Sequence, residues 1–257
     1  MLRKKNLNTE NFSSYKASYN LLKNKTILVT GAGSGIGKSA AIAYAKHGAQ
    51  VLLLGRTESK LESVYDQINR EGYTTPIILP MDLTSADEGL YQDLQKTLEG
   101  NLSCLDGLLL NAGVLGPLSP LENISFNDWS TVIQVNTHSC FLMVKACLPL
   151  MKSSTNSSIL FTSSSVGRKA RAYWGPYAVS KFAVEGMMQL LADELVNISS
   201  VRVNSLNPKA TDTAMRHAAY PGEDPSTNPS PDEIMPAYLY LMGNDSIGIT
   251  GRSLDAR

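Results

Sequence analysis

Long hydrophobic runs are missing from this sequence of 257 residues. No stretch reaches the roughly 18 consecutive apolar residues that indicate a membrane-spanning helix, and the N-terminal stretch lacks the apolar core of a secretory signal. Neither sign of charge is in excess, because 23 Lys and Arg residues balance 23 Asp and Glu residues. Such a balance gives no overall field that would attract nucleic acid or an anionic membrane. We therefore expect a cytoplasmic protein with neither nucleic acid nor a membrane as its partner.

Cysteine and histidine are also scarce, with three residues of each. Cys104, Cys140 and Cys147 stand in apolar stretches and lack the C-x-x-C spacing of zinc and redox sites. Buried, reduced thiols are the expected state, as is usual in the cytosol. The histidines form no ligand-like cluster in the sequence, so no metal site is predicted.

What the sequence does contain, from about residue 26 onward, is an alternation of short apolar runs with stretches long enough for helices. Uninterrupted apolar strands separated by helices indicate a parallel sheet that is covered on both faces. The fold class predicted is α/β: one domain with a doubly wound parallel sheet of about seven strands. The expected strands are 26–30, 50–54, 76–79, 108–110, 159–162, 201–206 and 252–255. The expected helices include 38–46, 58–70, 128–151 and 177–195.

Two segments depart from this alternation. Residues 1–24 are basic and rich in Ser and Asn, and we expect a flexible extension in front of a single domain at 25–257. Residues 211–232 contain several prolines directly after an expected strand, around one brief apolar piece at 214–219. A long irregular segment in this place is often a mobile cover over a site. We expect a lid here, with a plain surface loop as the alternative.

A glycine-rich turn joins the first expected strand to the first expected helix. Glycines allow the tight turn and let backbone N–H groups approach a diphosphate at the start of the helix. The strand before the turn and the helix after it are the context that a dinucleotide-binding Rossmann fold requires. The candidate cofactor-binding residues in this turn are Gly31, Gly33, Ser34, Gly35, Ile36 and Gly37.

The end of the second strand bears on the choice of cofactor. An NAD-binding fold usually places Asp or Glu here to hold the ribose hydroxyls, but this chain has Gly55 and Arg56. Arg56 can form charge-assisted hydrogen bonds to a 2′-phosphate, and Lys38 could assist. NADP(H) is therefore preferred, and NAD(H) stays possible if Arg56 only faces solvent.

Tyr177 and Lys181 stand four positions apart within an expected helix. Positions i and i+4 share one face, so the phenol and the ammonium point into the same space. A nearby positive charge favours the phenolate and would lower the pKa of the tyrosine. The pair predicts a general acid or base; the alternative is a solvated lysine beside a packed ring.

Four motifs occur in order along the chain: Thr-Gly-x-x-x-Gly-x-Gly at Thr30–Gly37, Asn-Ala-Gly at Asn111–Gly113, serines at 163–165, and Tyr177-x-x-x-Lys181. Together they resemble the short-chain dehydrogenase/reductase family, and the resemblance covers residues 25–255. Within that family, three further stretches are similar to the bacterial YciK-type oxidoreductases. These stretches are 161–168, 174–194 and 232–246.

The resemblance implies a catalytic role for four residues. Ser164 would hold the substrate oxygen, and Tyr177 would exchange a proton with it. Lys181 would hold the nicotinamide ribose hydroxyls and lower the pKa of Tyr177. Asn136 would position a water molecule for proton relay to the lysine.

Further cofactor contacts are implied by the same resemblance. Asp82 would meet the adenine, Asn111 would lie beside the adenosine ribose, and Thr213 would support the carboxamide or the diphosphate. The full set outside the glycine turn is Arg56, Asp82, Leu83, Asn111, Ala112, Gly113, Tyr177, Lys181, Thr211 and Thr213. One residue departs from the family pattern: Lys209 follows Pro208 where relatives have glycine, and it could crowd the nicotinamide or bring a cation to the cofactor.

The function expected is hydride transfer between NADP(H) and a small carbonyl or alcohol substrate. The alternatives are a 3-oxoacyl-thioester reductase and a protein that senses NADP(H) without catalysis. Tyr173, Trp174, Met215 and His217 could line an apolar or aromatic substrate pocket, or they could serve packing alone. The helix at 177–195 carries more apolar residues than one buried stripe needs, and the resemblance implies a homodimer or homotetramer.

Overall fold

Seven strands form one parallel sheet in the order β3-β2-β1-β4-β5-β6-β7. The computed structural model describes residues 12–257. The order reverses after β1, which confirms the doubly wound α/β architecture. The strands are β1 Thr26–Thr30, β2 Gln50–Gly55, β3 Ile77–Pro80, β4 Gly107–Leu110, β5 Ser158–Thr162, β6 Arg202–Asn207 and β7 Arg252–Asp255.

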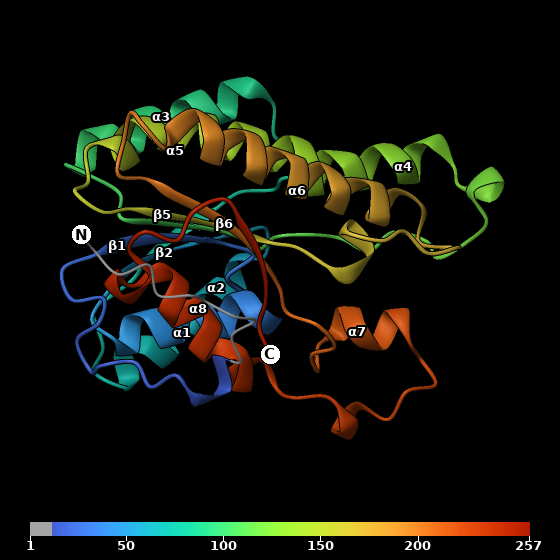
Figure 1. Ribbon diagram of the computed structural model, residues 1–257, viewed down its shortest axis with the longest axis horizontal. Helices are drawn as coiled ribbons and strands as arrows, with labels where there is room; N and C mark the ends of the chain where they lie inside the picture. The colour runs from blue at the N-terminus through green and yellow to red at the C-terminus, as the bar shows by residue number, and fades with distance from the viewer. Residues whose placement is uncertain (1–11) are drawn as a thin grey trace.

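Helices cover both faces of the sheet (Figure 1). One face carries α3, α4, α5 and α6, and the other carries α1, α2 and α8. Two separate hydrophobic clusters fill these two layers, so each face of the sheet has its own core. The helices are α1 Gly35–Lys46, α2 Glu58–Arg70, α3 Glu88–Asn101, α4 Phe126–Ile133, α5 Ser139–Lys152, α6 Gly175–Leu195, α7 Ala214–Ala219 and α8 Met235–Met242.

The prediction of a single helix at 128–151 is wrong in one respect. α4 and α5 are joined by a π-helical segment, Gln134–His138, so the run is helical but not uniformly α-helical. Single π turns of this kind often occur at functional sites. Here the segment contains Asn136, whose side chain bonds to the backbone of Val114 instead of facing solvent.

The expected flexible extension at 1–24 must be corrected for its second half. Residues 1–11 lie outside the described part of the chain. Phe12, by contrast, is only 4% exposed, and its ring centroid lies 5.4 Å from that of Tyr240 on α8. Leu22 is completely buried. The domain core therefore begins before the boundary expected at residue 25, because apolar side chains of the preceding segment complete the layer under α1 and α8.

Residues 211–232 fold into a compact segment beside the carboxyl edge of the sheet. The brief apolar piece expected there is the helix α7. The backbone N–H of Asp212 donates to the carbonyl of Pro229 over 2.8 Å and so joins the two ends of the segment. Arg216 of α7 donates from Nε to Glu223 over 2.6 Å, which ties the helix to the chain that follows it.

Candidate active site

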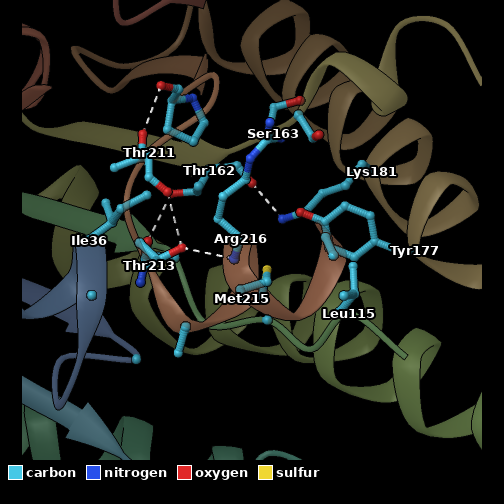
Figure 2. A pocket seen from close by; sticks show the side chains of 18 of the residues that line it. Ile36, Leu115, Thr162, Ser163, Tyr177, Lys181, Thr211, Thr213, Met215 and Arg216 are labelled. Atoms are coloured by element: carbon cyan, nitrogen blue, oxygen red, sulfur yellow. Dashed lines mark hydrogen bonds between the residues drawn. The ribbon is translucent and has the colours of Figure 1, made fainter. Parts of the chain in front are cut away.

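A cavity of about 280 Å³ opens at the carboxyl edge of the sheet, under α7. Parallel strands end at the same edge, so the loops after β1, β4, β5 and β6 meet there. The cavity brings together most of the predicted site residues, and Figure 2 shows several of them converging from these loops. The predicted residues that line it are Gly31, Ser34, Gly35, Ile36, Asn111, Ala112, Gly113, Ser164, Tyr177, Lys181, Thr211 and Thr213.

The glycine turn has the geometry that a diphosphate needs. Gly31 and Gly35 have φ angles of +69° and +52°, which side chains rarely adopt. A Cβ atom on Gly37 would lie 2.2 Å from the carbonyl oxygen of Gly31, so only glycine fits there. Ser34 caps α1 without a side-chain hydrogen bond. The first N–H groups of the helix therefore remain available to an anion in the cavity.

The loop after β4 is held against the glycine turn by Thr30. The Thr30 hydroxyl accepts hydrogen bonds from the backbone N–H groups of Asn111 and Ala112, both over 3.0 Å. The Asn111 side chain donates to the Thr30 carbonyl over 3.3 Å. These bonds fix two of the loops that line the cavity relative to each other.

Arg56 lies outside the cavity, exposed at the end of β2. A cation that the sequence reasoning missed lies nearby: a Cβ atom on Gly33 would stand 3.0 Å from Cβ of Lys60, so Lys60 flanks the glycine turn. Its four-residue spacing from Arg56 is the signal that could have found it.

Asp82 and Leu83 also lie outside the cavity, in the loop after β3. Asp82 accepts hydrogen bonds from the N–H and the hydroxyl of Thr84, over 3.0 and 2.7 Å. The bond from the Thr84 backbone is the main reason that the pKa of Asp82 lies below its usual value. Leu83 is buried in the hydrophobic core. The expected contact of this loop with adenine stays a prediction.

Tyr177 and Lys181 occupy the first two turns of α6 and are 8% and 5% exposed. The ammonium of Lys181 lies 5.6 Å from the centroid of the Tyr177 ring and donates to the carbonyl of Thr162 over 2.7 Å. Figure 2 shows both side chains pointing into the same space. Ser164 forms a hydrogen bond with the Tyr177 phenol. The geometry thus places the three side chains in one group.

The pKa of Tyr177 does not shift in the expected direction. Burial raises it to about 12, although the hydrogen bond with Ser164 opposes the rise. Burial also lowers the pKa of Lys181. The expectation of a lowered tyrosine pKa is wrong in this geometry because the ammonium is directed at the Thr162 carbonyl and the phenol is desolvated.

Asn136 is buried behind the cavity and does not line it. Its Oδ1 atom accepts from the N–H of Val114 over 2.8 Å. Its Nδ2 atom donates to the carbonyl of Val114 over 2.9 Å and to the hydroxyl of Ser180 over 3.0 Å. Ser180 in turn donates to the carbonyl of Tyr177. Asn136 therefore ties the loop after β4 to α6, and its expected role in holding a water molecule stays a prediction.

Comparison with known proteins agrees with this geometry. The family model for short chain dehydrogenases matches residues 25–224. The chain belongs to the short-chain dehydrogenase family. The chain is 47% identical to the oxidoreductase YciK of Escherichia coli over 243 residues, which is 95% of this chain and 96% of YciK.

Solved structures of similar short-chain dehydrogenases have the same fold. One from Pseudomonas syringae is 53% identical, with a TM-score of 0.93, and the match covers 95% of this chain and 98% of that one. Another, from Shigella flexneri 2a, was solved in complex with NADP. It is 47% identical, with a TM-score of 0.90, and the match covers 93% of this chain and 99% of that one. The chain is thus an oxidoreductase of this family with a Rossmann-like fold.

The part of this short-chain dehydrogenase cavity next to Tyr177 is apolar and aromatic. Trp174 and Met215 line it, in agreement with the apolar or aromatic pocket that the sequence suggests for them. Leu115 and Tyr220 line it as well, and no sequence signal marks them. The Trp174 ring lies between Tyr177 and Tyr220, with ring centroids 5.8 and 5.9 Å away.

Two residues considered for the same pocket do not line it. Tyr173 is exposed, and His217 pairs with Asp212 over 2.6 Å. Lys209 does line the cavity, at the start of the loop that follows β6. Its ammonium lies 3.4 Å from Oδ2 of Asp255.

Cys140 and Cys147 are buried and unbridged, and Cys104 is partly exposed. Burial raises the pKa of Cys140 to about 11 and that of Cys147 to about 12, so both are protonated thiols at neutral pH. Residues 12–257 contain no group of three or more His, Cys, Asp or Glu side chains arranged to hold a metal ion. Over the same residues, no helix has both the length and the apolar character needed to cross a membrane.

Proposed function

We propose that this short-chain dehydrogenase transfers a hydride between NADP(H) and a small carbonyl or alcohol substrate. The observation that carries the proposal is the convergence of Ser164, Tyr177 and Lys181 in the cavity that also receives the start of α1. The complex of the Shigella flexneri structure with NADP supports the choice of cofactor.

The cofactor would be held by groups at two ends of the glycine turn. The first N–H groups of α1 would bind the diphosphate, because the helix dipole also favours an anion there. Arg56 and Lys60 would bind the 2′-phosphate, since they flank the outer side of the turn. Lys181 would hold ribose hydroxyls after exchanging its bond to Thr162.

When bound, the cofactor supplies the hydride to the carbonyl carbon. Tyr177 donates its phenolic proton to the carbonyl oxygen, and an alcohol results. Ser164 donates a hydrogen bond to the same oxygen as negative charge develops on it. Tyr177 then recovers a proton from solvent. Oxidation of an alcohol runs these steps in reverse, with Tyr177 as the base.

A second copy of the chain is part of the proposal. Val179, Phe182 and Leu190 are exposed on α6, and Phe141 is exposed on α5. The three α6 residues are spaced so that they share one side of the helix. Burial of this surface against a second copy would give a homodimer or a homotetramer, which sedimentation velocity would distinguish from a monomer.

The test of the function is oxidation of NADPH with a panel of aldehydes, ketones, quinones and 3-oxoacyl thioesters. The wild type should turn over members of the panel, and Tyr177→Phe should lose activity by at least about a hundredfold, as for removal of a general acid. Substrate-dependent turnover that survives Tyr177→Phe would contradict the mechanism. NADPH binding without turnover of any panel member would favour a sensor instead. Activity confined to thioesters would favour the thioester reductase.

A further inference from the structure

The charge of the cavity is one-sided. Lys181, Lys209 and Arg216 line it, and none of the residues that line it in the described part of the chain is Asp or Glu. Two of the three cations have their donors engaged. Lys181 donates to the Thr162 carbonyl. Arg216 forms a two-bond ion pair with Glu223 and lies 3.7 Å from the centroid of the Tyr220 ring.

Lys209 is held more weakly. Its ammonium makes one contact, at 3.4 Å, with Oδ2 of Asp255, and the two side chains are 43% and 38% exposed. Exposed pairs of this kind contribute little to stability. Asp255 does not depend on Lys209, because its Oδ1 atom accepts from Arg168 over 2.7 Å and from Asn207 over 3.0 Å. The Lys209 ammonium can therefore leave Asp255 at low cost.

The backbone at Lys209 is held in an unusual conformation. Its φ angle of +60° lies in the left-handed region, which glycine adopts freely and a lysine adopts only with strain. The N–H of Lys209 donates to Oδ1 of Asn207 over 3.0 Å and so fixes this turn. Strain that surrounding contacts maintain at the wall of a cavity is an indication of function.

Lys209 lines the same cavity as Ser164 and Tyr177, and it stands two residues after the end of β6. The glycine turn is covered by Thr213, whose methyl group would lie 3.5 Å from a Cβ atom on Gly35. The Lys209 ammonium contacts Asp255, which also accepts from Asn207 and from Arg168. Once released from Asp255, the ammonium could turn toward an anion in the cavity that Lys209 and Ser164 both line.

We propose that Lys209 binds a carboxylate or phosphate group of the substrate. The proposal rests on the function proposed above, because it assumes that a carbonyl substrate occupies the cavity beside Tyr177. Leu115, Trp174, Met215 and Tyr220 form the rest of that wall and suit an apolar or aromatic body. The substrate class is then a small aldehyde or ketone that combines an apolar body with one anionic group.

The test compares two probes, 4-formylbenzoate and its methyl ester, which share an aromatic body and an aldehyde but differ in charge. Their dissociation constants are measured by calorimetry on the protein loaded with NADP⁺, which has no hydride to give to an aldehyde. The wild type should bind the carboxylate about tenfold more tightly than the ester, the size expected of one charge-assisted hydrogen bond. Lys209→Met and Lys209→Gly should lose this preference. Lys169→Met, an exposed lysine of the neighbouring loop that does not line the cavity, should keep it.

Three outcomes of the binding measurements decide against the proposal. Failure of the wild type to bind 4-formylbenzoate, equal binding of the two probes, or a preference that survives both Lys209 variants would overturn it. Loss of NADPH affinity in the variants, with the probe ratio unchanged, would place the anion on the cofactor. Turnover is recorded separately from binding. A binding preference without NADPH oxidation would count against the proposed function and not against the anion site. Turnover of both probes without a binding preference would count against the anion site and not against the proposed function.

Discussion

Ser163 donates a hydrogen bond to Oε1 of Glu185 over 2.5 Å, so the residue before Ser164 is tied to α6 one turn beyond Lys181. Glu185 is only 6% exposed. Its Oε2 atom accepts from the hydroxyls of Ser205 on β6 and Ser253 on β7, over 2.7 and 2.8 Å. One buried carboxylate thus joins β6, β7 and the residue after β5 to the helix that carries Tyr177.

Replacement of Glu185 should destabilise the fold strongly. Glu185→Ala leaves three hydroxyls and the Nε–H of Arg168 without their acceptor, so we expect the free energy of unfolding to fall by about 3–5 kcal/mol in a urea titration. Glu185→Gln keeps the shape of the side chain and should lower the free energy of unfolding by less than Glu185→Ala does. Glu194→Ala, exposed on the same helix, is the control and should change stability by less than about 0.5 kcal/mol. A change of that small size in Glu185→Ala would contradict the account of the junction.

Tyr177 should remain a phenol until strongly alkaline pH in the absence of cofactor. Its pKa is raised by burial to about 12, above the usual value near 10, so the neutral form is favoured in the folded protein and stability from this group is lost only between about pH 10 and 12. The difference in ultraviolet absorbance between the wild type and Tyr177→Phe should show no phenolate below about pH 10. A phenolate signal between pH 7 and 9 that is absent from the variant would show that Lys181 dominates over burial.

Arg56 should distinguish the two nicotinamide cofactors. Loss of charge-assisted hydrogen bonds to a 2′-phosphate corresponds to about tenfold to a hundredfold in affinity. Arg56→Ala should therefore weaken NADPH binding by that factor in a fluorescence titration and leave NADH binding nearly unchanged. Lys60→Ala should act in the same direction. Lys38→Ala provides the contrast, and equal effects of Arg56→Ala on both cofactors would contradict the assignment.

Asn136 should act on the rate more than on cofactor binding. Asn136→Ala leaves the N–H and the carbonyl of Val114 without their partner, which should lower the free energy of unfolding by about 1–3 kcal/mol. It also frees α6 from the loop after β4, so kcat should fall while the Kd of NADPH changes little. Thr137→Val is a matched control, because the buried Thr137 hydroxyl has no hydrogen-bond partner within residues 12–257. A variant Asn136→Ala with wild-type kcat would exclude a positioning role.

Phe12 should stabilise the domain from outside the matched family region. Removal of its buried ring in Phe12→Ala should lower the free energy of unfolding by about 3 kcal/mol. Tyr19→Ala, whose side chain is 76% exposed, should have almost no effect. The Kd of NADPH should be unchanged in both, because α8 packs under the sheet away from the cavity. Equal stability of the two variants would show that the segment at 12–24 is not part of the core.

Most of the sheet could be predicted because its strands are short, uninterrupted apolar runs. β1 and β7 have the expected bounds, and the other strands differ from expectation by no more than one residue at either end. The convergence of Ser164, Tyr177 and Lys181 could also be predicted. Ser164 follows the carboxyl end of β5, and the four-residue spacing of Tyr177 and Lys181 puts both on one face of α6.

The features that could not be predicted depend on contacts between distant residues. The π segment contains Asn136, which bonds to Val114, 22 residues earlier in the chain. The direction of the Lys181 ammonium depends on the Thr162 carbonyl at the end of β5. Because the ammonium is directed there, burial is the main influence on the pKa of Tyr177. Phe12 contacts a ring near the other end of the chain. No local pattern of residues contains this information.

The π segment also determines where the chain can tolerate the loss of a residue. A π turn is an α-helix that accommodates one extra residue, and each residue of an α-helix turns the chain by about 100°. The wider turn absorbs the rotation of about 100° that one extra residue would add. Deletion of one residue within Gln134–His138 would therefore restore a regular helix and leave α4 and α5 in nearly the same orientation relative to each other. Asn136 would turn away from Val114 and Ser180. In a relative whose sequence is one residue shorter at this point, contacts other than those of Asn136 would have to fix the loop after β4 to α6.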